Sequence, residues 1–390
     1  MNNMNLLPAI LLGGPPHSGK SVLAHSLSQK LRERNLPHYL LRAAPDGEGD
    51  WTQWISLETL SDIRFKGTWT LPWVRVVCRD IAARTLPLLV DMGGKPQDEQ
   101  FAIFNQCTGI ILVTPSDDEA AHTQWQAWAA ACGLPILADL RSALEGLSWV
   151  QTLGPILQGT LVGLERGEEA GGPVVDAAVE LLARLFYFSK DEVRRRNLSS
   201  APEDAVLVDL EALALALDAG ERPGHFGNSP QAVCDILAHI PMDIPLAIYG
   251  RMPCWLAALL GARRWVRYQF DVRLGWVRPP HFKISAQADE NRWLGYTWEQ
   301  TDDGLRLCVA LREYYLDYAL MQQLAVPALP PHAAPVQRVR FFGKLPLWAF
   351  TALGQAYRDV PEIWAEQPRE VQSKPTAATM PDGPPPQNEP

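Results

Sequence analysis

Short apolar runs alternate with helical patterns along residues 7–188. Runs of this kind, bounded by glycine, proline or polar residues, predict buried strands, and apolar residues repeating every three or four positions predict helices. The strands that we expect span residues 8–13, 38–42, 87–92, 109–114 and 134–138, with a weaker one near 155–162. The helices that we expect span residues 20–34, 97–106, 117–131 and 174–187, and residues 74–85 are also helical in pattern.

Several of the expected strands are apolar without interruption, as in Leu88-Leu89-Val90 and Ile110-Ile111-Leu112-Val113. Such runs suit strands that are covered on both faces, which is the usual situation in a parallel sheet. The pattern therefore predicts an α/β domain with a mostly parallel sheet over residues 1–188. Ligands of such sheets bind at the carboxyl ends of the strands.

A glycine-rich loop follows the first expected strand and precedes the first expected helix. Residues 14–21 read Gly-Pro-Pro-His-Ser-Gly-Lys-Ser, which matches the P-loop pattern from Gly14 through Gly19 to Lys20 and Ser21. The backbone N–H groups of such a loop and the N-terminus of its helix hold a polyphosphate. Lys20 is expected to reach the β- and γ-phosphates, and the Ser21 hydroxyl is expected to bind Mg²⁺.

Asp91 ends another expected strand and is followed by two glycines. This is where P-loop proteins place a carboxylate that holds Mg²⁺, directly or through water, although a helix-capping role is the alternative. Asp80 is an alternative candidate for this magnesium-binding carboxylate, but it lies within a helical pattern. His17, inside the glycine loop, either contacts phosphate or only fills the turn. The sequence contains no Asn-Lys-x-Asp guanine signature, and we see no convincing arginine finger. ATP with Mg²⁺ is therefore the expected ligand.

The amino-acid composition of the chain changes after the expected α/β domain. Residues 189–203 are charged and then small and polar, which predicts a linker. Residues 373–390 contain six prolines and almost no apolar side chains, which predicts a disordered tail.

The region between the expected linker and tail repeats itself at an offset of 93 residues. Residues 249–261 read YGRMPCWLAALLG, and residues 342–354 read FGKLPLWAFTALG. In each copy an apolar run precedes a Gly-basic turn, a proline that can begin a helix, and a tryptophan. We expect two small α+β domains, at residues 204–288 and 289–372, that form an internal pseudo-dimer.

The net charge of the chain is −9, so it has no overall field for long nucleic acid or an anionic membrane. Residues 251–283 nevertheless carry seven basic side chains against one acidic one. Basic and aromatic residues interleave in a strand-like stretch from Trp265 to Trp276. This predicts a polyanion site in which rings stack on bases and arginines hold phosphates. The alternative is a solvated basic face with half-buried aromatic rings.

The six cysteines follow no metal-binding spacing and are expected to be free thiols in a reducing compartment. The N-terminus lacks the pattern of a signal peptide, and no apolar stretch is long enough to span a membrane. We expect a cytoplasmic protein.

The segment 248–281 resembles the CRISPR-associated Csx-three family, which consists of ring nucleases of type III CRISPR systems. The matching pieces are Gly-Arg-x-Pro-x-Trp at 250–255, Asp-x-Arg-Leu-Gly at 271–275, and His281. The family is also known fused to a P-loop domain of AAA type, which the glycine loop here resembles. The resemblance extends over residues 205–285, with a diverged second copy at residues 290–370.

The resemblance implies binding of cyclic tetra-adenylate and its cleavage to linear di-adenylate with manganese. It implies Asp271, Arg273 and His281 as catalytic residues, with Asp271 as a possible manganese ligand. The phosphate-binding residues are expected to be Arg251, Arg267, Arg273 and Lys344. The family's histidines between the helix and the Asp strand are absent here. Cleavage of the ring and binding without cleavage therefore both stay open, as do dimers or higher assemblies.

Two other interpretations remain. One is a P-loop kinase of a small molecule or of a nucleic-acid end, with the C-terminal half as a substrate or assembly module. The other is an adaptor in which nucleotide binding orders an assembly without turnover.

Overall fold

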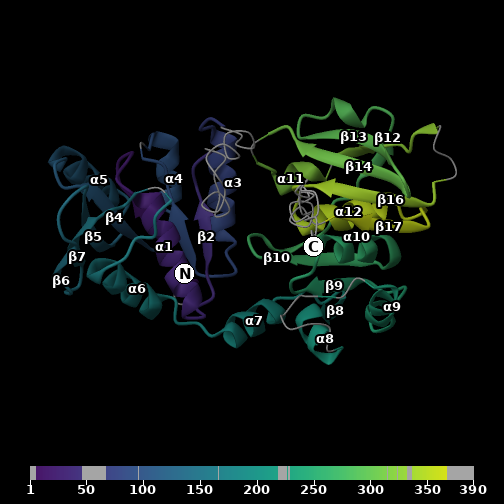
Figure 1. Ribbon diagram of the computed structural model, residues 1–390, viewed down its shortest axis with the longest axis horizontal. Helices are drawn as coiled ribbons and strands as arrows, with labels where there is room; N and C mark the ends of the chain where they lie inside the picture. Colours follow the sequence, from purple (N-terminus) through teal and green to yellow (C-terminus); the bar gives the residue numbers. More distant parts are fainter. Residues whose placement is uncertain are drawn as a thin grey trace, which may run out of the picture.

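The computed structural model describes residues 6–45, 67–94, 96–165, 167–217, 226, 229–313, 315–322, 324–331 and 336–366. The expected tail at 373–390 and the last residues of the expected second copy lie outside this part of the chain. One sheet with its helices forms the N-terminal half, and two four-stranded sheets with a small two-stranded one form the described C-terminal half (Figure 1).

The N-terminal half contains a seven-stranded sheet in the order β2-β3-β1-β4-β5-β7-β6. Every neighbouring pair is parallel except β6 and β7. The expected α/β domain with a mostly parallel sheet is thus confirmed. The strands are β1 (Ala9–Gly13), β2 (Tyr39–Arg42), β3 (Leu88–Asp91), β4 (Gly109–Pro115), β5 (Ile136–Ala143), β6 (Trp149–Thr152) and β7 (Leu157–Val162).

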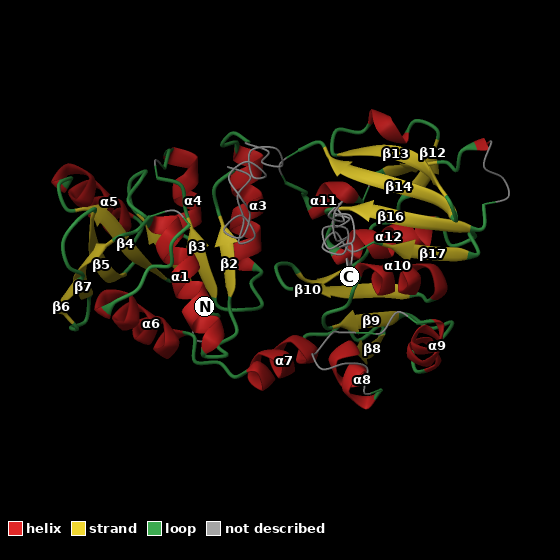
Figure 2. Cartoon of the chain, in the orientation of Figure 1, coloured by secondary structure: helices red, strands yellow, loops and turns green. Residues whose placement is uncertain are grey.

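Helices cover both faces of this sheet, as Figure 2 shows. α1 (Lys20–Glu33) and α6 (Pro173–Leu185) pack in one apolar cluster, where Leu23, Leu27 and Leu31 are fully buried. The helices α3 (Leu71–Ala82), α4 (Phe101–Phe104) and α5 (Glu119–Ala131) contribute to the cluster on the other face. The apolar positions of α1 recur every four residues, so its buried stripe follows directly from the sequence.

Three parts of this half differ from the expectation. β5 begins at Ile136 and continues to Ala143, well past the expected end at residue 138. Its last three residues, Arg141-Ser142-Ala143, are partly buried and two of them are polar, so the run of apolar residues ends before the strand does. The strand β6 was not expected, and the expected helix at 97–106 is a 3₁₀ turn (Asp98–Gln100) followed by the short α4.

The segment 189–203, expected to be a linker, contains helix α7 (Lys190–Ser199). The Ser189 hydroxyl accepts a hydrogen bond from the backbone N–H of Glu192 at 3.1 Å, which caps the first turn. Ser-x-x-Glu is a helix-start signature, and the charged residues that follow are good helix formers. The charge of this segment therefore reflects a solvated helix, which joins the two halves (Figure 1).

The C-terminal half contains two four-stranded sheets, ordered β11-β10-β9-β8 and β13-β14-β16-β17, and a small β12-β15 pair. The strands are β8 (Val206–Asp209), β9 (Leu246–Tyr249), β10 (Val266–Asp271), β11 (Gly275–Val277), β12 (Lys283–Ser285), β13 (Leu294–Thr301), β14 (Gly304–Leu311), β15 (Ala325–Pro327), β16 (Arg338–Gly343) and β17 (Glu362–Ala365). The helices are α8 (Leu210–Ala216), α9 (Pro230–Ala238), α10 (Cys254–Arg263), α11 (Tyr318–Met321), α12 (Leu347–Ala356) and a 3₁₀ turn at Ala288–Glu290.

The repeated sequence occupies equivalent places in the two large sheets. β9, α10 and β10 form a parallel crossover in the first sheet, and β16, α12 and β17 form one in the second. α10 and α12 begin and end at positions 93 residues apart. The stretch from Trp265 to Trp276 is not one strand, because a turn after Asp271 reverses the chain into the antiparallel strand β11.

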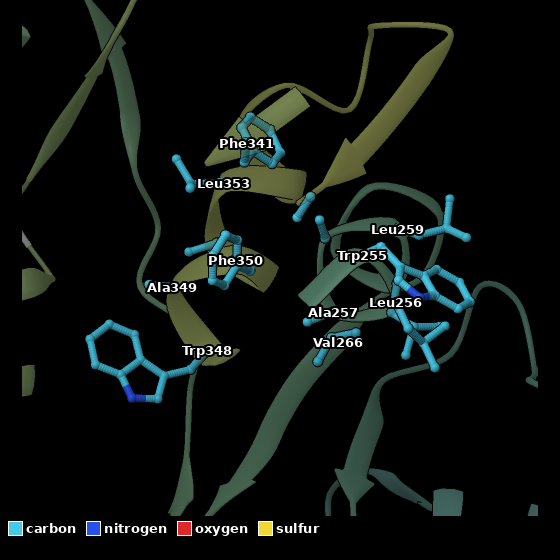
Figure 3. Packing of buried hydrophobic residues seen from close by; sticks show 14 of the residues in the cluster. Trp255, Leu256, Ala257, Leu259, Val266, Phe341, Trp348, Ala349, Phe350 and Leu353 are labelled. Carbon is cyan, nitrogen blue, oxygen red and sulfur yellow. The ribbon is translucent and has the colours of Figure 1, made fainter. Parts of the chain in front are cut away.

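The two copies meet through α10 and α12, whose buried side chains lie between the sheets (Figure 3). An added Cβ at Gly261 would lie 2.1 Å from the carbonyl oxygen of Thr351, and one at Gly354 would lie 2.0 Å from that of Ala258. Glycine at both repeat positions therefore allows the helix backbones to touch. Trp255 of the first copy stacks on Trp364 of the second, with centroids 4.8 Å apart and planes 3° apart.

A search for membrane spans among the described helices finds none of sufficient length and apolarity.

Candidate functional site

The glycine loop lies between β1 and α1, at the carboxyl edge of the large sheet. Gly19 has φ +82°, a left-handed conformation that favours glycine, and a Cβ there would lie 2.5 Å from the Leu164 side chain. A Cβ at Gly14 would lie 1.9 Å from the Val113 carbonyl oxygen. Both glycines of the motif are therefore required by the path of the backbone. The helix N-terminus at Gly19 has no side-chain cap, so its N–H groups remain available to an anion.

Lys20 lies against this loop and is 6% exposed. Its Nζ donates to the Pro15 carbonyl oxygen at 2.6 Å and contacts the Ser18 hydroxyl at 3.4 Å. Burial lowers the pKa of Lys20 to about 8, against a raising effect of Asp91 and a further lowering by Arg42. A bound polyphosphate would supply the negative charge that the buried ammonium lacks.

Because of this low pKa, both the folding stability and the nucleotide affinity are expected to depend on pH. The unfolded chain binds a proton at Lys20 up to a higher pH, so this group makes folding stability rise between about pH 8 and pH 10. A bound polyphosphate raises the pKa of Lys20, so nucleotide binding above about pH 8 takes up a proton and the affinity falls as pH rises. Calorimetry in buffers of different ionisation enthalpy measures this uptake. Lys20→Arg, which does not titrate in this range, is expected to bind without it; equal uptake in both proteins would contradict the assignment.

Asp91, Ser21 and Arg42 form a compact cluster at the same edge, because β3 pairs directly with β1 on one side and β2 on the other. Arg42 Nη1 forms an ion pair with Asp91 Oδ2 and donates to the Ser21 hydroxyl at 2.7 Å. Asp91 is 4% exposed, and its Oδ1 atom has no hydrogen-bond partner among the described residues. A buried carboxylate oxygen without a partner, next to the serine of a P-loop, fits the ligand set of Mg²⁺ beside a phosphate. When bound, the ion would neutralise phosphate charge, and Ser21 and Asp91 would hold it.

Two residues of this edge were missed in the sequence. Arg42 ends β2, and Thr114 lies near the end of β4 with a fully buried hydroxyl that has no hydrogen-bond partner in the described part. Their only sequence signal is a polar residue at the carboxyl end of a strand. His17 was noticed in the sequence, and the structure leaves it exposed in the loop with φ +63°.

The Asp-x-Arg-Leu-Gly motif forms the turn between β10 and β11. Asp271 Oδ1 accepts from the backbone N–H groups of Arg273 at 2.8 Å and Leu274 at 3.2 Å. Arg273 Nε lies 3.8 Å from the same oxygen. The structure thus brings Asp271 and Arg273 together, and the Asp271 side chain is 13% exposed whereas that of Arg273 is 39% exposed.

This turn lies against the N-terminal half. The Thr85 hydroxyl donates to the Val272 carbonyl oxygen at 2.6 Å. Although desolvation opposes the charge of Arg273, the nearby Tyr39, Asp271 and Asp80 outweigh it and raise the pKa of Arg273. Asp80, on α3, therefore faces this second site rather than the P-loop.

Further contacts hold α3 to the C-terminal half. Arg79 Nη1 lies 2.7 Å from Asp317 Oδ1, and the ring of Trp73 meets that of Tyr315 edge-on at 5.2 Å. We call the surface formed by α3, Thr85 and the 271–275 turn the seam.

The other basic residues expected to bind phosphate have separate surroundings. Arg267 forms an ion pair with Asp204 at 2.7 Å. Arg251 is exposed and lies near Glu211, and Lys344 is exposed just before α12. His281 is exposed after β11, and no hydrogen bond or ion pair joins it to Asp271 or Arg273 among the described residues.

The surroundings of Asp271 do not form a manganese site. Two backbone N–H groups and a guanidinium already approach Oδ1, and none of these can ligate a metal ion. Within the described ranges, no group of three or more His, Cys, Asp or Glu side chains could hold a metal ion.

Comparison with known proteins shows a distant structural likeness. No family model matches the chain, and no curated protein matches it. Among solved structures it is similar to the signal recognition particle 54 kDa protein from Aeropyrum pernix K1 in complex with GDP. The identity is 17%, the TM-score is 0.30, and the match covers 51% of each chain, so this chain spans about half the length of that protein. A likeness of this size assigns no activity.

Proposed function

We propose that the N-terminal half binds ATP with Mg²⁺ in the cradle between β1 and α1. The observation that carries the proposal is the cluster of Lys20, Ser21 and Asp91, in which a buried ammonium and a buried carboxylate oxygen both lack the partners that a metal–triphosphate would provide. Lys20 would bind the β- and γ-phosphates, Ser21 and Asp91 would hold the ion, and the N-terminus of α1 would bind phosphate oxygens.

We infer from the family resemblance that the C-terminal half binds cyclic tetra-adenylate and acts as a type III CRISPR accessory module. The Arg273 side chain, which is 39% exposed and lies beside Asp271, supports this, since an arginine that is held in place but still accessible suits a phosphate. For ring cleavage, a ribose 2′-hydroxyl would attack the adjacent phosphorus to form a 2′,3′-cyclic phosphate, and the bond from phosphorus to the 5′-oxygen would break. The proton of the 2′-hydroxyl would end on the departing 5′-oxygen, and Arg273 would stabilise the developing charge. Asp271 would orient the attacking hydroxyl. No step here uses manganese.

The test incubates the purified full chain with cyclic tetra-adenylate, with manganese and separately with a chelator, and follows binding and products. We expect linear di-adenylate from the wild type and none from Asp271→Ala, because the variant loses the carboxylate that orders the turn. Asp302→Ala, at an exposed position in the turn between β13 and β14, serves as the matched control.

Binding without product would assign the C-terminal half to sensing rather than cleavage. Absence of binding to cyclic tetra-adenylate, with ATP binding intact, would overturn the second inference and leave the first. Transfer of phosphate from ATP to an acceptor would favour a kinase.

A further inference from the structure

The guanidinium of Arg42 occupies the position between Ser21 and Asp91 where a magnesium ion would lie. It bonds to the Ser21 hydroxyl at 2.7 Å and pairs with Asp91 through the same Nη1 atom. These are the two side chains that a P-loop site offers to Mg²⁺. We propose that Arg42 is a placeholder, which neutralises Asp91 in the nucleotide-free protein and is exchanged for Mg²⁺ when the metal–nucleotide binds. The proposal rests on the proposed binding of ATP and specifies how the charge of Asp91 is neutralised before the nucleotide binds.

The burial of Asp91 explains why a placeholder is needed. A carboxylate that is 4% exposed is costly to leave without a compensating charge. Lys20 compensates this charge only from a distance, because its Nζ is directed to the Pro15 carbonyl oxygen and to Ser18. Arg42 is the cation that contacts Asp91 directly in the described structure.

Arg42 and Mg²⁺ exclude each other from this position. Both are positive, both use the Ser21 hydroxyl oxygen, and both approach the one carboxylate of Asp91, so the ion binds only when the guanidinium has left. The arginine side chain is 20% exposed, which gives it a route away from the cluster. It also lies at the end of β2, where its departure leaves the strand pairing with β3 in place. Arg42 is thus a positioning residue whose removal lowers the magnesium concentration that binding requires.

The first experiment measures binding of a fluorescent ATP analogue to the full chain while MgCl₂ is titrated. In Arg42→Met we expect half-maximal binding at a magnesium concentration about tenfold lower than in the wild type, the size expected for one charge-assisted hydrogen bond that no longer has to be broken. Arg42→Lys keeps the charge but carries it on a shorter side chain as a more strongly hydrated ammonium, so it should fall between the two. Arg34→Met, which removes a surface ion pair with Glu180 on α6, is the matched control and should behave as the wild type.

The second experiment uses MgCl₂ alone and follows thermal unfolding. Magnesium should raise the melting temperature of Arg42→Met and leave that of the wild type unchanged, because only the variant presents a vacated pair of ligands. An unchanged or higher magnesium requirement in Arg42→Met, together with no stabilisation by the metal alone, would overturn the proposal and make the Arg42–Asp91 pair purely structural. If the wild type binds no nucleotide, the proposed function fails, and the metal-only experiment still decides whether Arg42 is a placeholder.

Discussion

Lys20→Ala is expected to weaken ATP binding by at least about 100-fold. The ammonium makes charge-assisted hydrogen bonds to phosphate, each of which contributes on the order of 1.5–3 kcal/mol. The side chain is buried against the loop, so no neighbouring cation can take its place without moving. Equilibrium binding of ATP to the full chain, with Mg²⁺ present and at a pH near 7, measures the effect.

Lys30→Ala provides the control for this variant. Lys30 lies near the end of the same helix, where its Nζ is 3.7 Å from Asp176 on the surface, so its loss should leave ATP affinity within about twofold of the wild type. Equal affinity in Lys20→Ala and wild type would mean that the loop is a structural turn. GTP measured alongside decides whether the absence of a guanine signature excludes that nucleotide.

Gly354→Leu is expected to destabilise the C-terminal half by at least about 3 kcal/mol, the upper part of the range for overpacked cores. A Cβ at this position would lie 2.0 Å from the Ala258 carbonyl oxygen. A change of side-chain rotamer cannot relieve this contact, so α10 and α12 must move apart. Separation would also disturb the stack of Trp255 on Trp364, which joins the two copies. Urea unfolding followed by near-ultraviolet circular dichroism detects both effects, because stacked indoles dominate that signal.

Gly171→Leu serves as the control for Gly354→Leu. A Cβ there meets no atom within 4 Å, so Gly171→Leu should unfold close to the wild-type midpoint. A Gly354→Leu midpoint that matches Gly171→Leu would show that the helices tolerate a side chain between them. The close approach would then not be a condition of the fold.

The strands of the N-terminal half were predictable because they are buried on both faces. Because both faces are covered, every residue of Leu88-Leu89-Val90 and of the run from Ile110 to Val113 is apolar. Continuous apolar runs of this length indicate such strands. β6 was missed because it lies at the edge of the sheet, where Trp149 is half exposed and the apolar signal weakens. The helix α7 within the expected linker was not predicted, because a helix that contacts its neighbours through few apolar residues is charged along most of its length.

The residues of the candidate site were likewise predictable only in part. Gly14, Gly19, Lys20 and Ser21 are local in sequence, and the loop that joins a strand to a helix fixes their relative positions. Arg42 joins them only through the pairing of β2 with β3, and this pairing has no sequence signature. Asp80 and Arg273 are 193 positions apart and meet across the seam, which the sequence of either half cannot indicate.

The strand β2 has a consequence for how the two halves affect each other. It carries Arg42 at its carboxyl end, in the nucleotide site, and Tyr39 at its amino end, near Arg273 of the seam. One short element therefore borders both proposed ligand sites. Thermodynamic linkage requires that any factor by which ATP changes the affinity for a ligand at Arg273 is the factor by which that ligand changes the affinity for ATP. Where that factor differs from one, a nucleotide pool that rises or falls in the cell would shift the ligand concentration at which the second site fills, and occupancy of the second site would shift the nucleotide affinity in return.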